Sequence, residues 1–254
     1  MSEDGAPQAW EVYRTRLDEE GHLAAVLVDV SIRGADSKRP HLVRVVVHLQ
    51  EPDYDTGMPH KEESKALYAL EDELTPALER AGARLVGRLT TQGVRDFVYY
   101  APGSISEDRV RDVLSQWPRY HFDLTQEDDA EWAFYHEILV PSPREWQSIM
   151  NGKVIHNLSE RGDTLDTPRE VDHHLLFPTE AALKSFLGDL EGFTCVSSEA
   201  QEDQAGFSLH LVRTHAVDFS TVDAIVSELT ERAEAVSGTY DGWGCAAVAD
   251  PNSD

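Results

Sequence analysis

The stretch Arg169-Glu170-Val171-Asp172-His173-His174-Leu175-Leu176-Phe177 is read as a strand in which every second residue, from Val171 to Phe177, belongs to a more apolar set. This alternation is typical of a β-strand that buries one face and exposes the other. The odd-numbered residues from Val171 to Phe177 form the more apolar side, so Asp172 and His174 point the opposite way. The stretch therefore predicts a sheet with one covered face and one open face.

The elements after this strand set the order of the C-terminal half. We expect a helix, two strands and a second helix, at 179–190, 193–196, 207–213 and 220–238. Gly238 is predicted to cap the last helix, because glycine accepts the left-handed conformation at low cost. Tyr240-Asp241-Gly242-Trp243-Gly244 then stands in place of a last strand, and its Asp-Gly pair predicts a sharp turn.

The N-terminal half has a similar order of elements. We expect strands at 10–16, 23–32, 42–49, 84–90, 94–100 and 120–124, and helices at 60–80 and 106–116. Pro76 is predicted to kink or split the first helix. From Leu42 to Leu124 the order is β-α-β-β-α-β, the split β-α-β pattern. The predicted fold is α+β, with two tandem ferredoxin-like α/β sandwich domains at 1–140 and 141–254.

The segment between the halves is predicted to pack against a domain. Asp128 to Pro143 carries Trp132, Phe134 and Tyr135, which are costly to leave in water. Ser142-Pro143-Arg144-Glu145 then matches a capping box and predicts the start of a helix that stops at Gly162.

The charge of the chain is its most unusual bulk property. Its 254 residues include 47 acidic and 22 basic side chains, for a net charge of -25. Before Pro141 there are 27 acidic and 15 basic residues, and 20 and 7 follow, so both halves are acidic. Phosphate backbones and anionic membranes would be repelled, whereas a basic protein partner would be attracted. The alternative is that the charge serves only solubility.

Composition also bears on compartment. Cys195 and Cys245 lie in apolar, strand-like runs without metal-type spacing, so two buried free thiols are expected rather than a disulfide. The first residues have neither a basic region nor an apolar region, and no apolar run of membrane-spanning length follows. We expect a cytoplasmic protein that does not bind a membrane.

Motifs for catalysis or metal binding are not found. His173 and His174 are neighbours on a strand and point to opposite faces, so they cannot both bind one ion without a bulge. His173 is predicted to be a core-facing structural residue, with a binding-surface role as the alternative. Nucleophile elbows, phosphate-binding glycine loops and metal-ligand spacings are missing from the sequence. We therefore expect no enzyme activity, no metal and no cofactor.

The aromatic pair Tyr240 and Trp243 allows two interpretations. The rings either close the end of the sandwich or form a partner-binding edge, since Tyr and Trp dominate interface hot spots. The predicted protein-binding residues are Tyr240, Asp241, Gly242, Trp243, Asp172 and His174.

These residues resemble those of a known family. Asp172-His173-His174-Leu175, the following helix, and Tyr240-Asp241-Gly242-Trp243-Gly244 with Asp250-Pro251-Asn252 are similar to the regulator of ribonuclease E activity B (RraB) family. The resemblance covers about Gln147 to Asn252. The upstream half resembles a bacterial domain of unknown function that is often fused ahead of RraB-like domains. Its marks are Gly87-Arg88, Gly93 and Tyr99-Tyr100.

The resemblance implies a non-catalytic acidic regulator that binds ribonuclease E and changes RNA turnover. An acidic binder suits the basic RNA-binding segments of such a nuclease. The alternative is a ligand-binding or enzymatic N-terminal domain that the RraB-like domain controls. A third possibility is self-association.

Overall fold

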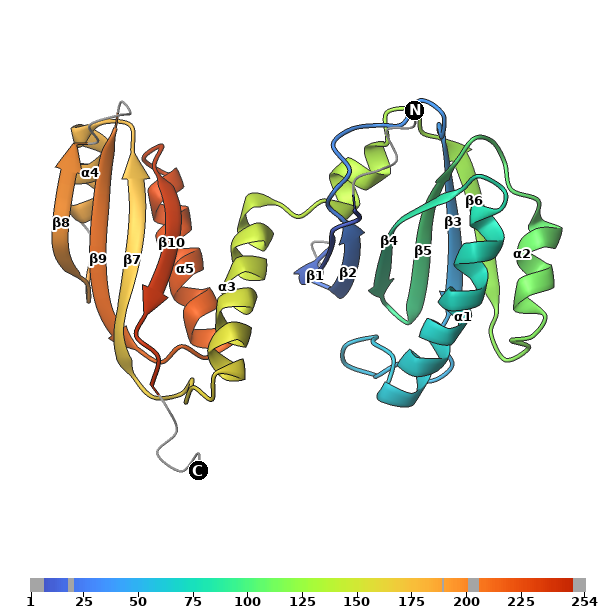
Figure 1. The fold of residues 1–254 in the computed structure, drawn as a ribbon, viewed down its shortest axis with the longest axis horizontal. Coiled ribbons are helices and arrows are strands. Elements are labelled where there is room, and N and C mark those ends of the chain that lie inside the picture. Colours follow the sequence, from blue (N-terminus) through green and yellow to red (C-terminus); the bar gives the residue numbers. More distant parts are fainter. Residues whose placement is uncertain (1–6, 18–20, 189, 201–205, 249–254) are drawn as a thin grey trace. The chain divides into compact units, whose positions relative to one another are not determined.

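The computed structural model describes residues 7–17, 21–188, 190–200 and 206–248 (Figure 1). The chain divides into two compact units, Met1–Glu145 and Trp146–Asp254. Each unit contains its own antiparallel sheet and its own hydrophobic core. The mixed α+β class predicted for the chain is confirmed.

The N-terminal unit is built on a six-stranded sheet with the order β1-β2-β4-β5-β3-β6. Its elements, in chain order, are β1 (Trp10–Arg16), β2 (Leu23–Asp29), β3 (His41–His48), α1 (Lys61–Glu79), β4 (Arg84–Thr91), β5 (Val94–Ala101), α2 (Glu107–Leu114), β6 (Phe122–Asp128) and the π-helix η1 (Tyr135–Leu139).

One face of this sheet is covered by α1 and α2 (Figure 1). The core below the helices contains Val43, Val45 and Val47 of β3 together with Leu67, Leu70 and Leu74 of α1. The predicted split of the helix at Pro76 is wrong, because α1 runs unbroken from Lys61 to Glu79 with Pro76 inside. A kink at Pro76 stays a prediction. Pro76 lies in the last turn, where little helix remains for the missing hydrogen bond to disturb.

The segment that joins the two halves was predicted to pack against a domain, and it packs within the N-terminal unit. Trp132 is fully buried, and its ring stacks on Tyr100 with the centroids 4.0 Å apart. The indole N–H of Trp132 donates to the Arg39 carbonyl at 2.9 Å, and the Tyr135 hydroxyl donates to the Asp29 carbonyl at 2.8 Å. The segment is therefore a part of this unit's core and not a free linker.

The C-terminal unit is built on a four-stranded sheet with the order β10-β7-β9-β8. Its elements, in chain order, are α3 (Pro143–Glu160), β7 (Arg169–Phe177), α4 (Glu180–Gly188), β8 (Thr194–Ala200), β9 (Phe207–His215), α5 (Phe219–Glu234) and β10 (Thr239–Cys245). The predicted loop after residue 196 is in part strand β8, and its residues 201–205 lie outside the described residues.

Helices α4 and α5 lie on one face of this sheet (Figure 1). The predicted alternation along β7 is confirmed, since the odd-numbered residues are buried and the others are exposed or half-buried. Val171, Leu175 and Phe177 pack against apolar side chains of α5, among them Val226 and Leu229.

The helix starts follow local chemistry. Ser142 Oγ accepts from the Glu145 N–H at 3.3 Å, and a Glu145 carboxylate oxygen accepts from the Ser142 N–H at 2.7 Å, which confirms the capping box. Helix α5 starts one residue before the predicted Ser220, because the Asp218 carboxylate caps it by accepting from the Thr221 N–H.

Candidate functional site

Tyr-Asp-Gly-Trp-Gly is part of a strand and not the turn that the Asp-Gly pair predicted. It forms most of β10, which pairs antiparallel with β7 at the edge of the sheet. The pairing register shifts between Tyr240 and Gly242, and Asp241 is the extra residue of this β-bulge. Gly242 supplies the bulge with a φ of 137°, which side chains other than hydrogen rarely allow.

The bulge decides where the two aromatic rings go. In a regular strand, residues three apart point to opposite faces. Here Tyr240 pairs with Leu175 and Trp243 pairs with His173, so both rings lie on the face that the helices cover. Tyr240 is buried and Trp243 is half-buried in the core of the unit. Tyr240 is therefore enclosed within the unit, whereas Trp243 keeps part of its surface accessible.

Tyr240 belongs to a buried chain of hydrogen bonds. Its hydroxyl lies 2.8 Å from Nδ1 of His173, and Nε2 of His173 lies 3.2 Å from Nε2 of His215. Nδ1 of His215 lies 2.7 Å from the Ala216 carbonyl oxygen, which can only accept. His215 therefore donates from Nδ1 and accepts at Nε2, His173 donates from Nε2, and Tyr240 donates to His173.

These directions hold while both imidazoles are neutral, because a second proton on His215 would set its Nε2–H against the Nε2–H of His173. A second proton on His173 would reverse its bond with the Tyr240 hydroxyl, which can also accept. The environment agrees. Burial, with the nearby His215 as the second cause, lowers the pKa of His173 to about 3. Burial also lowers the pKa of His215 and raises that of Tyr240. The buried imidazole of His173 thus has the structural position predicted for it.

Trp243 is held by a second polar connection. Its indole N–H donates to Asn151 Oδ1 at 2.9 Å, and Asn151 Nδ2 donates to an Asp223 carboxylate oxygen at 3.3 Å. Asn151 is 1% exposed, so its amide would be costly to leave unpaired. The side chain of Gln147 also donates to the Tyr240 carbonyl at 3.4 Å. Helix α3 is thereby fastened to β10.

Gly238 does not have the predicted left-handed conformation. The positive φ, 61°, belongs to Ser237, and the Gly238 N–H donates to the Ala233 carbonyl at 2.7 Å to close the helix. Glycine is needed at 238 for another reason. A Cβ there would lie 2.5 Å from Cε1 of Phe177. Glycine is required at 238 because the chain passes close to Phe177 of β7. Helix capping by a left-handed glycine is not the reason.

Asp172 and His174 lie on the face of the sheet opposite α4 and α5, which we call the open face. His174 is exposed and stacks on His210, with the ring centroids 4.8 Å apart. His210 Nε2 lies 2.6 Å from a carboxylate oxygen of Asp172. Gly242 and Gly244 pair with His174 and Asp172 in register, so β10 carries no side chain beside them.

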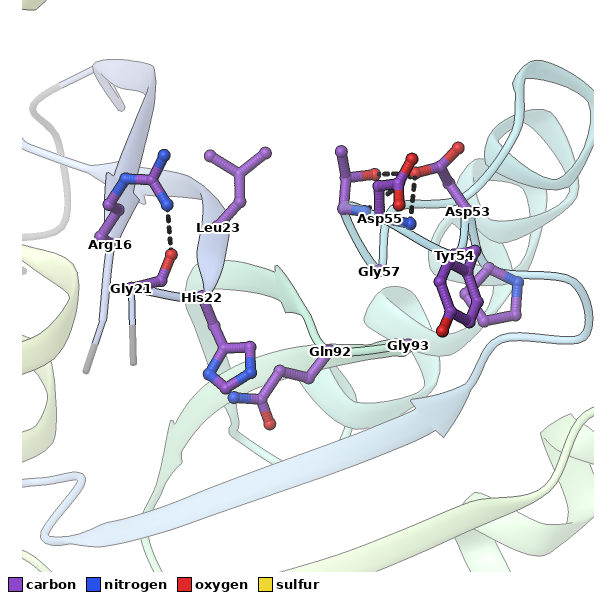
Figure 2. A pocket seen from close by; sticks show the side chains of 12 residues that line it. Arg16, Gly21, His22, Leu23, Asp53, Tyr54, Asp55, Gly57, Gln92 and Gly93 are labelled. Carbon is purple, nitrogen blue, oxygen red and sulfur yellow. Dashed lines mark hydrogen bonds between the residues drawn. The ribbon is translucent and has the colours of Figure 1, made fainter. Parts of the chain in front are cut away.

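The N-terminal unit has a pocket of about 700 Å³ at one end of its sheet (Figure 2). Arg16, the last residue of β1, and His22, which precedes β2, form one wall. The loop with Asp53 and Tyr54 forms the other wall, and the turn at Gln92 lies below.

The pocket floor is tightly built. Gln92 has a φ of 47°, and a Cβ on Gly57 would lie 2.9 Å from the Gln92 backbone. The Gly93 N–H donates to the Gly57 carbonyl at 3.0 Å and so ties the loop to the turn. The lining combines cationic and anionic side chains, which suits a polar ligand carrying both kinds of charge.

The described residues contain no group of three or more His, Cys, Asp or Glu side chains placed to hold a metal ion. None of the described helices has the length and apolar character needed to cross a membrane. Cys195 and Cys245 are free thiols, as predicted, but the predicted burial is wrong, because Cys195 is exposed and Cys245 is half-buried.

The structure brings together residues that the sequence did not connect. Asn151, His210 and His215 contact the predicted site residues but were not predicted with them. His210 could have been found from the alternation along 207–213. This alternation places His210 on the face opposite Leu209 and Leu211. For Asn151 we see no local signal.

Comparison with known proteins supports both halves of the resemblance. Residues 8–140 match the model of a family of unknown function, DUF695, which covers more than half of the chain, and the chain belongs to this family. Residues 148–245 match the RraB model, described as regulator of ribonuclease activity B, so the chain also carries an RraB domain.

Other comparisons add little. No curated protein matches the chain. A crystal structure of an unknown protein from Galdieria sulphuraria is similar at 11% identity, covering 82% of this chain and 98% of that chain, with a TM-score of 0.21.

Proposed function

We propose that the chain is a non-catalytic, acidic protein-binding regulator of a ribonuclease E-like nuclease. The observation that carries this proposal is the match of residues 148–245 to the RraB family. The acidic charge of the C-terminal half supports it, because such a nuclease binds RNA through basic segments. A binder of this kind would lower activity by occlusion, and the proposal includes a cytoplasmic location where the nuclease acts.

The binding surface in this proposal consists of Asp172, His174, Asp241 and Gly242. Asp241 and His174 are exposed, and about 45% of the Asp172 side chain is accessible. Tyr240 and Trp243 act from inside, by holding β10 against α3 and β7. Their rings therefore support the surface and do not contact the partner.

We also propose that both units have the ferredoxin-like topology. In the N-terminal unit, the strands of the β-α-β-β-α-β order lie as β4-β5-β3-β6, all antiparallel. In the C-terminal unit the corresponding order is β8-β9-β7-β10. Both are the strand order 2-3-1-4 that this topology requires, and the N-terminal unit adds the β1-β2 hairpin at one edge.

Affinity capture from the native host tests the function. The full chain is used as bait with RNA removed by nuclease treatment, and we expect a ribonuclease E-like protein among the captured proteins. The purified nuclease should then cleave a model RNA more slowly when the chain is added. Asp172→Asn combined with Asp241→Asn should weaken this inhibition.

The control is Glu234→Gln, which removes a carboxylate from α5 on the covered side of the sheet. It should inhibit like the natural sequence. An unchanged cleavage rate at saturating concentrations of the chain would rule out the regulator function for that nuclease.

A second candidate is ligand binding by the N-terminal unit, favoured by the pocket in Figure 2. A specific ligand stabilises the state that binds it, so it should raise the melting temperature. Small dipolar compounds, such as amino acids and their derivatives, are the first to screen. Any shift should be lost in Asp55→Asn with Tyr54→Ala, both exposed lining residues. A screen without shifts would set this candidate aside.

A further inference from the structure

The open face of the C-terminal sheet carries acidic side chains without a compensating arginine or lysine among the described strand residues. The register places Glu170, Asp172 and Glu199 on this face. The two arginines of these strands, Arg169 and Arg213, share the parity of Val171 and so belong to the covered side. The face therefore attracts positive charge.

This face also has an open slot along β10. Gly244 pairs with Asp172, and Gly242 pairs with His174. An added Cβ on either glycine would meet no atom within 4 Å. Two neighbouring positions beside Asp172 and His174 are thus unfilled, whereas side chains occupy the equivalent positions of β9.

The side of the slot is suited to a planar cation. One carboxylate oxygen of Asp172 is bonded to His210, and among the described residues no hydrogen bond is made to the other. His174 lies two residues from Asp172 on the same face of β7, and its ring is stacked on His210. A carboxylate next to an exposed ring offers both an ion pair and a stacking surface.

We propose that this slot, defined by Gly242, Gly244, Asp172 and His174, receives an arginine side chain from an extended basic segment of a partner protein. The guanidinium lies over Gly244, donates to the free carboxylate oxygen of Asp172 and stacks on the ring of His174. Arginine fits better than lysine, because its fork is planar, weakly hydrated and able to stack. This inference rests on the proposed function and names the chemistry of its partner.

Peptide binding to the full chain tests the slot. The probes are two fluorescent peptides of equal length and charge, one alternating arginine with serine and the other lysine with serine. At about 0.15 M salt, where diffuse charge attraction is partly screened, we expect the arginine peptide to bind more tightly. Asp172→Asn and Gly244→Val should each weaken it about tenfold, or about 1.4 kcal/mol.

The variants are chosen to keep the fold. Gly244→Val fills the slot from a position where a Cβ meets nothing, and Asp172→Asn keeps the shape of the side chain. An unchanged melting temperature and circular dichroism spectrum verify this. Glu199→Gln is the matched control, since it removes one charge from the same face at another strand. It should change the affinity by less than about twofold.

Equal binding of both peptides, or equal losses in Asp172→Asn and Glu199→Gln, would overturn the slot in favour of diffuse attraction. The proposed function fails separately. If the nuclease is captured equally by the natural chain and by Gly244→Val, the function stands and the slot is wrong. If the slot binds arginine as expected but no nuclease is captured or inhibited, the slot stands and the assigned partner is wrong.

Discussion

The hydroxyl of Tyr240 donates to Nδ1 of His173 across 2.8 Å, and this bond orients a buried imidazole whose other nitrogen donates to His215. The three side chains form one polar chain inside an otherwise apolar core. The arrangement in which Tyr240 is the donor holds while both histidines are neutral. The core of the RraB domain is therefore sensitive to protonation.

The first prediction concerns pH. The pKa of His173 is about 3 in the folded chain, below the value of about 6.5 expected when unfolded. Below pH 6.5 His173 binds a proton in the unfolded chain but stays neutral in the folded chain. Stability from this group is thus present above that pH and is lost as the pH falls. Between about pH 7.5 and 5.5 the unfolding free energy should drop by roughly 1 kcal/mol.

Hydrogen exchange of the β7 amides, followed at several pH values, measures this change within the C-terminal unit. His173→Gln serves as the comparison, because glutamine can both donate and accept but does not titrate. This variant should be less stable at pH 7.5 and should show a smaller slope. Equal slopes for the two proteins would contradict the prediction.

The second prediction concerns Asn151, which bridges Trp243 and Asp223. Asn151→Ala should lower the unfolding free energy by about 1–3 kcal/mol, since it leaves the indole N–H without its acceptor. Asn151→Asp keeps that acceptor but sets a carboxylate against Asp223. Adding Asp223→Asn should then restore much of the lost stability. Additive effects in this double-mutant cycle would show that the bridge is not coupled.

The third prediction compares two glycines near β10. Gly238→Ala places a methyl group 2.5 Å from the ring of Phe177, so either the chain or the ring must move. A cost of about 1–3 kcal/mol is expected from such overpacking. Gly244→Ala meets open space and should change stability by less than about 0.5 kcal/mol. Urea denaturation measures the unfolding free energy of both variants. A similar loss of stability in the two variants would refute the packing explanation.

The fourth prediction concerns the segment after β6. Trp132 is fully buried against Tyr100, so Trp132→Ala should cost about 3–5 kcal/mol in the N-terminal unit. Trp117 is only partly buried, and Trp117→Ala should cost clearly less. Hydrogen exchange of β5 amides reports on this unit alone. If the two variants lose equal stability, the segment is not part of the core.

Local patterns in the sequence were sufficient for most of the elements. Alternation along 169–177 predicted which side of β7 is buried, and Ser142 with Glu145 predicted the start of α3. These features depend on residues only a few positions apart, whose geometry follows from the period of a strand or the first turn of a helix. The burial of Trp132 followed from the cost of exposing a large aromatic side chain.

The Asp-Gly pair shows where local reasoning failed. Asp241 and Gly242 have the chemistry of a turn, but pairing with β7 makes them a bulge in an edge strand. A preference for positive φ fits either structure, and only the hydrogen-bonding partner separates them. Similarly, Gly238 was predicted from its own flexibility, whereas the ring of Phe177 is what requires it.

The sequence by itself determined the α+β class, the order of most strands and helices, the acidic character and the opposite orientations of His173 and His174. Tertiary structure alone decided that Tyr240 and Trp243 point inward, because the bulge depends on the register with β7. It also brought Tyr240 to His173, 67 residues away along the chain, and Trp243 to Asn151, 92 residues away. Contacts at such separations are set by how the elements pack, which no local period encodes.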